Sequence, residues 1–308
     1  MDRLIDHALG AYLGLAVGDA LGATVEFMLP REIAHQYGMH KEIIGGGWLK
    51  LEAGQVTDDT EMSLALGCAL LASDGWNGKA VAEAFVAWLK SGPADIGNTC
   101  RRGIRRYMVD GSLSGPVNIG DGGNGAAMRI LPVVLATLND ENALEAQIIE
   151  QCHITHNHPL SDSASLALGK MTQILVKGGG VKSCRSIVNE LLAEHPEFRF
   201  SPYPGRASGY IVDTMQTVLH HFFGTDSFES CVVDTVNRGE DADTTGAIAG
   251  MLAGALYGKT AIPKRWLDKL DSQISSEIEK QVEELLRLAQ GKVAIISPEI
   301  FCAADPVK

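Results

Sequence analysis

Two short acidic segments carry the residue types best suited to metal chemistry. The first is residues 57–61 (Thr-Asp-Asp-Thr-Glu), and the second is residues 240–245 (Glu-Asp-Ala-Asp-Thr-Thr). Each mixes carboxylates with threonine hydroxyls where an amphipathic or apolar helix is expected to begin. Hard oxygen ligands of this kind suit Mg²⁺ or Mn²⁺, whereas zinc prefers histidine and cysteine. If the two segments meet in the fold, they form a two-cation site for hydrolytic chemistry.

Helix capping is the simpler interpretation of each segment taken singly. Asp58 followed by Glu61 fits a capping-box pattern, and carboxylates at a helix start interact favourably with the helix dipole. One cap needs one acceptor, however, and several crowded carboxylates repel one another unless a cation lies between them. We therefore favour metal binding and keep capping as the alternative.

The composition indicates one large globular domain. The chain has 308 residues, of which 45% are hydrophobic, enough for a substantial core. We expect a single domain over residues 1–290, followed by a C-terminal tail over residues 291–308. The net charge of −12 argues against nucleic acid as the main partner, because no cationic surplus is available to neutralise phosphates.

The cysteines and the N-terminal segment indicate a cytoplasmic protein. The six cysteines are scattered and show no Cys-x-x-Cys pair, as expected of a reduced protein. No basic segment followed by an apolar stretch marks a signal peptide near the N-terminus. Because Asp19 and Asp243 interrupt or bound the best apolar runs, we expect no segment that inserts into a membrane.

Helical periodicity dominates the chain, and alternating strand patterns are almost absent, so we predict an all-α fold. The expected helices span roughly residues 3–20, 60–73, 79–90, 98–108, 125–138, 141–154, 161–176, 183–193, 209–223, 228–237, 243–257 and 273–289. Residues 293–297 are the one short candidate strand.

Two of these helices carry a glycine at every fourth position. The first has glycines at positions 10, 14, 18 and 22, and the second at 246, 250, 254 and 258. Glycine inside a helix costs about 1 kcal/mol relative to alanine, so four in register need a reason. We predict two central helices with closely packed backbones. The second would deliver Asp241 and Asp243, and the first Asp19 and Glu26 nearby; tight core packing alone is the compatible alternative.

Residues 120–125 form a glycine-rich segment that formally matches Gly-x-Gly-x-x-Gly. It is a weak dinucleotide-binding signature, because no strand precedes it and no βαβ unit surrounds it. A glycine-rich turn before a helix can still present N–H groups to an anion such as a pyrophosphate. A flexible loop at a helix start is the alternative.

Three further positions have both a functional and a structural interpretation. His156, in a segment with His153 and His158, fits a polar substrate contact better than a metal ligand, and a structural hydrogen bond is a third choice. Asp95 lies before an expected helix, where a lone aspartate is usually a cap or turn residue. Tyr210, at the start of another helix, is more often a packing residue than a platform for a base.

Several phrases together resemble the ADP-ribosylglycohydrolase family in order and spacing, from about residue 8 to residue 290. They are Gly-Asp-Ala-Leu-Gly at 18–22 with Glu26, Gly-Gln-Val-Thr-Asp-Asp-Thr at 54–60, Gly-Asn-Gly-Ala-Ala-Met-Arg at 123–129, and residues 239–246. Residues 45–49, 98–106, 153–159 and 202–210 resemble one branch, whose members reactivate dinitrogenase reductase in nitrogen-fixing bacteria.

The resemblance implies an all-α fold around a dinuclear site with two divalent cations, Mn²⁺ or Mg²⁺. Carried over by motif, the implied metal ligands are Thr57, Asp58, Asp59, Asp241, Asp243 and Thr244. The implied catalytic residues are Asp95, which matches the acid facing the scissile bond, and Glu26, near the metals. The implied substrate-binding residues are Gly122, Gly123, Asn124, Gly125, His156, Asn157 and Tyr210, with Tyr210 stacking on adenine.

The function implied by the resemblance is hydrolysis of the N-glycosidic bond of ADP-ribosyl-arginine on a protein, with ADP-ribosylated dinitrogenase reductase as the protein substrate. Control by a PII-type regulatory protein, which can hold members at the membrane, is implied as well. The dense arginine group at 101, 102, 105 and 106 is our candidate for that contact, although such a group is usually a solvated face. A same-fold hydrolase of another ADP-ribose linkage, a two-metal phosphohydrolase that cuts the pyrophosphate, and a non-catalytic ADP-ribose-binding module remain alternatives.

Overall fold

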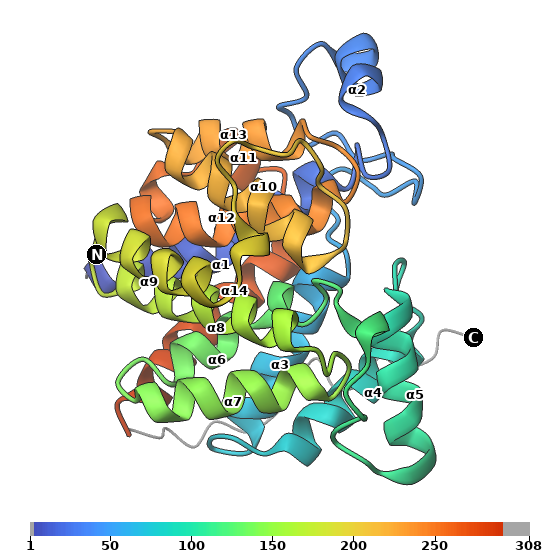
Figure 1. Cartoon of the computed structure of the whole chain (residues 1–308), viewed down its shortest axis with the longest axis vertical. Helices are drawn as coiled ribbons and strands as arrows, with labels where there is room; N and C mark the ends of the chain where they lie inside the picture. The colour runs from blue at the N-terminus through green and yellow to red at the C-terminus, as the bar shows by residue number, and fades with distance from the viewer. Residues whose placement is uncertain (1–2, 292–308) are drawn as a thin grey trace.

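A computed structural model describes residues 3–291, and every regular element in that range is helical (Figure 1). The α-helices are α1 Arg3–Gly22, α2 Pro30–Tyr37, α3 Asp58–Ala72, α4 Gly78–Ser91, α5 Asn98–Asp110, α6 Leu131–Ala136, α7 Glu141–His153, α8 Pro159–Val176, α9 Val181–Glu194, α10 Ile211–Gly224, α11 Phe228–Val236, α12 Ala242–Tyr257, α13 Lys264–Leu267 and α14 Ser272–Ala289. Short 3₁₀ turns occur at Ile119–Asp121, Ala127–Arg129, Pro196–Phe198 and Lys259–Ala261. The all-α prediction is confirmed; the candidate strand at 293–297 and almost all of the expected tail lie outside the described residues.

Helices α1 and α12 form the centre of the fold, and their backbones approach very closely. A Cβ atom added to Gly10 would lie 2.3 Å from the carbonyl oxygen of Gly254, and one added to Gly18 would lie 2.0 Å from that of Gly246. Both distances are far below ordinary van der Waals contact, so only glycine fits at these positions. The predicted pair of closely packed glycine helices is therefore confirmed.

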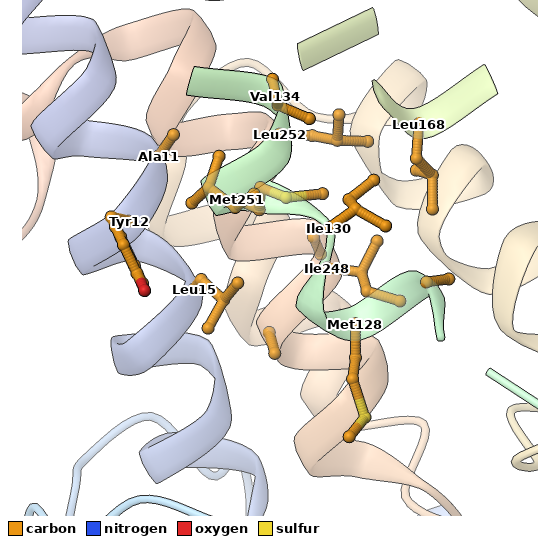
Figure 2. Packing of buried hydrophobic residues seen from close by; sticks show 14 of the residues in the cluster. Ala11, Tyr12, Leu15, Met128, Ile130, Val134, Leu168, Ile248, Met251 and Leu252 are labelled. Atoms are coloured by element: carbon orange, nitrogen blue, oxygen red, sulfur yellow. The ribbon is translucent and has the colours of Figure 1, made fainter. Parts of the chain in front are cut away.

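The remaining surfaces of this central pair are covered by apolar side chains from other helices. Figure 2 shows Leu15 of α1, Ile248 of α12, and Met128 and Ile130 of the 127–136 segment as members of one packed apolar cluster. All of these side chains are buried. Burial of this apolar surface fixes the position of the central pair within the bundle.

Helix α1 meets the length and composition criteria for a membrane-crossing helix, although we expected that no run would. Asp19 does not prevent this, because so long an apolar stretch passes these criteria with as many as two charged residues, here Asp6 and Asp19. Of its most apolar stretch, 83% is buried inside the protein. Its apolar character is therefore used in packing against α12 and the surrounding helices.

The prediction of one helix over residues 125–138 is wrong. Residues 127–129 form a 3₁₀ turn and α6 begins only at Leu131. Pro132 lies in the first turn of α6, where its missing N–H is tolerated, whereas inside a longer helix it would remove a hydrogen bond. The short helices α2 and α13 were not expected, since neither is long enough to show a clear periodicity.

Candidate metal centre and substrate site

The ends of three helices bring the two acidic segments together. Asp58 and Asp59 begin α3, Asp241 and Asp243 flank the start of α12, and Glu26 lies just after α1. Oxygen atoms of Glu26, Asp241 and Asp243 lie within 4.8 Å of one another. Such a spacing allows these three carboxylates to share one cation.

Asp59 connects the two acidic segments directly. Its Oδ2 accepts hydrogen bonds from the hydroxyls of Thr57 and Thr244, each at 3.2 Å. Its Oδ1 is buried and has no hydrogen-bond partner among residues 3–291. A buried carboxylate oxygen without a partner is costly, and a bound cation would satisfy it. The donor set of carboxylates and hydroxyls therefore fits a divalent cation such as Mg²⁺ or Mn²⁺.

Burial and mutual repulsion raise the pKa values of the acids in this cluster. Burial, together with the nearby charge of Asp95, raises the pKa of Glu26 and that of Asp58 to about 8. Burial also raises the pKa of Asp241 to about 6, and those of Asp59 and Asp243 well above their usual range. Within the described part of the chain, no lysine or arginine forms an ion pair with these five groups. A metal cation would supply the missing positive charge.

Asp19 of α1 holds the first acidic segment in place. Its carboxylate accepts hydrogen bonds from the backbone N–H of Thr57 at 3.0 Å and from the hydroxyl of Thr60 at 2.5 Å. The capping-box alternative is not what the structure shows. The N-cap residue Thr57 makes no side-chain cap bond, and Glu61 accepts instead from Nε1 of Trp88 at 2.7 Å.

Asp95 lies in the α4–α5 connection and faces the acidic cluster. It is half-buried, and its charge raises the pKa values of Glu26, Asp58 and Asp241. Burial raises the pKa of Asp95 itself, while the nearby guanidinium of Arg101 acts in the opposite direction. A carboxyl group at the edge of the cluster, with a raised pKa, is suited to proton transfer.

The glycine-rich loop lies against the segment that carries Tyr210. The backbone N–H of Asn124 donates to the carbonyl of Gly209 at 3.1 Å, and that of Ile211 donates to the carbonyl of Gly122 at 2.9 Å. The side-chain amide of Asn124 also donates to Oδ2 of Asp241. These bonds join the loop to the acidic cluster. Tyr210 is 45% exposed beside the loop, so one of its surfaces is open to a ligand.

His156 lies beneath the glycine-rich loop. A Cβ atom added to Gly123 would lie 3.2 Å from its Nε2, and one added to Gly125 would lie 3.0 Å from its Cε1, so the ring occupies the space of two absent side chains. Burial, with Arg129 nearby, lowers the pKa of His156 well below its usual range, and the ring is neutral. Asn157, the next residue, donates from its side-chain amide to the carbonyl of Gly115 at 2.7 Å and thereby holds the 111–118 connection.

The model of the ADP-ribosylglycohydrolase family matches residues 1–294. The chain is 60% identical over 284 residues to the ADP-ribosyl-[dinitrogen reductase] glycohydrolase of Rhodospirillum rubrum, covering 92% of this chain and 97% of the relative. It is 33% identical to the ADP-ribosylarginine hydrolase Tri1 of Serratia proteamaculans, covering 92% and 80%. Among solved structures, an ADP-ribosylglycohydrolase-related protein complex superposes with a TM-score of 0.84 at 32% identity, covering 94% of this chain and 100% of that one.

The chain belongs to the ADP-ribosylglycohydrolase family. In this glycohydrolase, sequence reasoning missed Trp48, whose Nε1 donates to Oε2 of Glu26 at 2.5 Å. The Trp48 ring also lies 5.2 Å from that of Phe27, and both rings are more than half exposed at the edge of the acidic cluster. Residues 45–49 entered the sequence analysis only through their resemblance to one branch of the family, and nothing in the local pattern indicated that Trp48 reaches back to Glu26.

Two strained residues next to the acids of this glycohydrolase were also not foreseen. Phe27 and Glu240 both have positive φ angles, of 61° and 51°, which are uncommon for residues other than glycine. The backbone N–H of Phe27 donates to the carbonyl of Glu240 at 2.6 Å. This contact ties the residue after Glu26 to the residue before Asp241, and so helps to bring the two acids together.

The arginine group on α5 is less open than the sequence suggested. Arg106 donates to the carbonyl oxygens of His153 and Ile154, and Arg102 forms an ion pair with Asp121. Arg105 is exposed and Arg101 is half-buried. Only the latter two arginines of the group remain candidates for contact with a partner.

Proposed function

We propose that this protein hydrolyses the N-glycosidic bond between ADP-ribose and an arginine side chain, and that its protein substrate is ADP-ribosylated dinitrogenase reductase. The observation that carries the proposal is the buried acidic cluster joined through Asn124 to a glycine-rich loop and an exposed tyrosine. The named activity of the relative from Rhodospirillum rubrum supports the substrate. We further propose residues 1–290 as the catalytic domain and residues 291–308 as its tail.

The cofactors in this proposal are two divalent cations, Mn²⁺ or Mg²⁺. The residues that would hold them are Thr57, Asp58, Asp59, Asp241, Asp243 and Thr244, and the position of Glu26 beside Asp241 and Asp243 adds it to the donors. When bound, such cations orient the ribose hydroxyls and lower the pKa of water for attack at the anomeric carbon. The partnerless Oδ1 of Asp59 supports this assignment.

The protein's own acids account for the rest of the chemistry. Cleavage of a bond between a sugar and nitrogen passes through an oxocarbenium-like state, which nearby carboxylates stabilise. Asp95, at the edge of the cluster, is placed to pair with the planar guanidinium of the leaving arginine. Its raised pKa also suits it to pass a proton between water and that group. Glu26, fixed by Trp48, is the second catalytic carboxylate in this proposal.

The remaining residues would bind the ADP part of the substrate. Backbone N–H groups of Gly122, Gly123 and Gly125 and the neutral ring of His156 would contact the pyrophosphate, and Tyr210 would stack on the adenine. Asn124 remains a proposed substrate contact by its match to the family motif, although its backbone N–H is engaged with Gly209. The half-exposed Tyr210 ring beside the loop supports this arrangement. Asn157 remains a proposed substrate contact by its match to the family motif, although its amide is engaged with Gly115.

The decisive experiment measures ADP-ribose released from an ADP-ribosyl-arginine protein, with Mn²⁺, with EDTA and with the Asp95→Asn variant. We expect release of intact ADP-ribose that requires the metal and is lost in Asp95→Asn while metal binding persists. Release of AMP would instead identify a phosphohydrolase. Binding of ADP-ribose without release would contradict the proposed linkage, and substrates with an ADP-ribosyl-serine linkage would then test the same-fold alternative.

A PII-type protein is the proposed regulatory partner, with Arg101 and Arg105 as its contact, and membrane association would occur through it. The exposure of Arg105 and the lack of an ion pair for either arginine among residues 3–291 support this choice. The double charge reversal Arg101→Glu with Arg105→Glu should abolish binding of a PII protein in a pull-down assay. Unchanged binding would reject this contact.

A further inference from the structure

A buried chain of hydrogen bonds connects Arg129, Thr155 and His156, and none of the proposed catalytic steps uses its first two members. Nη2 of Arg129 donates to Oγ1 of Thr155 at 2.7 Å, and the same oxygen lies 2.8 Å from Nδ1 of His156. All three side chains are at most 2% exposed. Each group must therefore find its hydrogen-bond partners within the protein or in a ligand.

The direction of these bonds follows from the chemistry of the three groups. A guanidinium only donates, so Thr155 accepts from Arg129. The threonine hydroxyl must then place its own proton, and Nδ1 of His156 is the acceptor within reach among residues 3–291. The reverse direction would leave a buried hydroxyl proton without an acceptor, at a cost comparable to a lost hydrogen bond. Nδ1 of His156 is therefore an acceptor, and the proton of the neutral ring is on Nε2.

Arg129 is well suited to impose this direction because several contacts hold it and a guanidinium can only donate. Its Nε donates to Oε1 of Gln151 at 2.9 Å, and Nη1 donates to the carbonyl of Gly125 at 3.0 Å. The guanidinium also lies over the ring of Phe85, 4.6 Å from its centre. Among the described residues it forms no ion pair with a carboxylate, so its positive charge remains available to an anion near the loop.

Thr155 is held as firmly as Arg129. Gly103 of α5 packs against it, and a Cβ atom at Gly103 would lie 2.5 Å from the Cα of Thr155. The backbone N–H of Thr155 donates to the carbonyl of Cys152 at 3.0 Å. The hydroxyl therefore meets both of its partners without a change of rotamer or backbone.

The other side of the His156 ring meets the glycine-rich loop. Nε2 is the atom that a Cβ at Gly123 would contact, at 3.2 Å, and it has no hydrogen-bond partner among residues 3–291. A nearly buried N–H donor without a protein partner, next to a glycine-rich loop, is suited to an anion.

We propose that Thr155, fixed by Arg129, is a positioning residue that holds His156 in the tautomer with the proton on Nε2, and that this N–H donates to the pyrophosphate of the bound ADP-ribose group. The second half of this inference rests on the proposed function, whereas the tautomer does not. Replacement of Thr155 would change substrate binding without removing any group that touches the substrate.

The test uses the full-length protein labelled with ¹⁵N-histidine and compares Thr155→Val with Thr155→Ser. Long-range ¹H–¹⁵N correlation spectra of the ligand-free wild type should show His156 with a protonated Nε2 and an unprotonated Nδ1. Thr155→Ser keeps the hydroxyl and should keep that signature. Thr155→Val has nearly the same shape but no hydroxyl, and should lose it.

Affinity for ADP-ribose, measured by calorimetry, provides the functional result. We expect Thr155→Val to bind about tenfold more weakly, equivalent to about 1.4 kcal/mol, while Thr155→Ser stays close to the wild type. In turnover assays KM should rise more than kcat falls, because the contact serves the bound substrate and the transition state alike.

Three results would overturn the proposal or part of it. A wild-type spectrum with the proton on Nδ1 rejects the tautomer, and this measurement needs no activity and no folded variant. Equal ADP-ribose affinity in Thr155→Val and Thr155→Ser rejects the role of the hydroxyl. A wild type that shows the predicted tautomer but does not bind ADP-ribose rejects the proposed ligand, and with it the proposed function, while leaving the hydrogen-bond chain intact.

Discussion

Replacement of Gly18 by alanine should separate the two central helices and destabilise the protein. The new Cβ atom would lie 2.0 Å from the carbonyl oxygen of Gly246, whereas ordinary contact begins near 3.4 Å. Neither partner can yield by changing a rotamer, because the obstructing atoms belong to the backbone of α12. The helices must therefore move apart by about 1 Å, with loss of packing along their whole contact.

The net magnitude follows from two opposing contributions. Alanine is a better helix former than glycine by about 1 kcal/mol, which favours the variant. Overpacking in a core typically costs about 1–3 kcal/mol, and contact with a rigid backbone places Gly18 at the upper end. We expect a net loss of about 2 kcal/mol in the free energy of unfolding.

Urea unfolding followed by circular dichroism measures this loss, with Gly224→Ala as the matched control. Gly224 lies at the end of α10, and a Cβ atom there would meet nothing within 4 Å, so its replacement should be neutral or slightly stabilising. Activity should fall in Gly18→Ala as well, since α1 and α12 carry the acids that must meet. Equal stability of Gly18→Ala and the wild type would refute the close-packing argument.

Three other predictions concern the site and the pH dependence of stability. In EDTA, Asp58→Asn should unfold at a temperature no lower than that of the wild type, because burial disfavours the charged form of Asp58. The variant should, however, lose the rise in unfolding temperature that Mn²⁺ causes in the wild type. That rise corresponds to about 2.7 kcal/mol of stabilisation when Mn²⁺ is in hundredfold excess over its Kd. A Mn²⁺ shift retained in that variant would exclude Asp58 as a ligand. Tyr210→Ala should raise KM by about tenfold to a hundredfold, since base stacking contributes about 1–3 kcal/mol, while Tyr210→Phe should not; equal KM values would remove Tyr210 from the site. Burial, with Arg238 nearby, lowers the pKa of His221 to about 3, so the contribution of the neutral ring to stability is present above pH 6.5 and is lost by about 1.4 kcal/mol per pH unit as pH falls toward 3. Urea unfolding at pH 7 and pH 5.5 should therefore show a smaller change in the free energy of unfolding in His221→Gln than in the wild type. An equal change in both proteins would contradict this prediction.

The sequence determined the fold class and most of the helices, because apolar residues at helical spacing must face a common core. Helices α3, α4 and α14 begin and end within two residues of their predicted bounds. The central pair was also foreseen, since glycine at every fourth position has few explanations other than close backbone contact. The break at residues 125–138 was missed because a proline near a helix start and one inside a helix look alike in the local pattern.

The types of the site residues were apparent from sequence, but their geometry was not. The two acidic segments signalled a cation through their crowded charges, yet only the tertiary structure brings Asp59 against Thr244, 185 positions further along the chain. It also decided the contact of Trp48 with Glu26 and the buried chain from Arg129 to His156. Local sequence fixes which groups can donate or accept a proton. Which of them become partners depends on the packing of helices that are distant in sequence, and only the folded chain sets that packing.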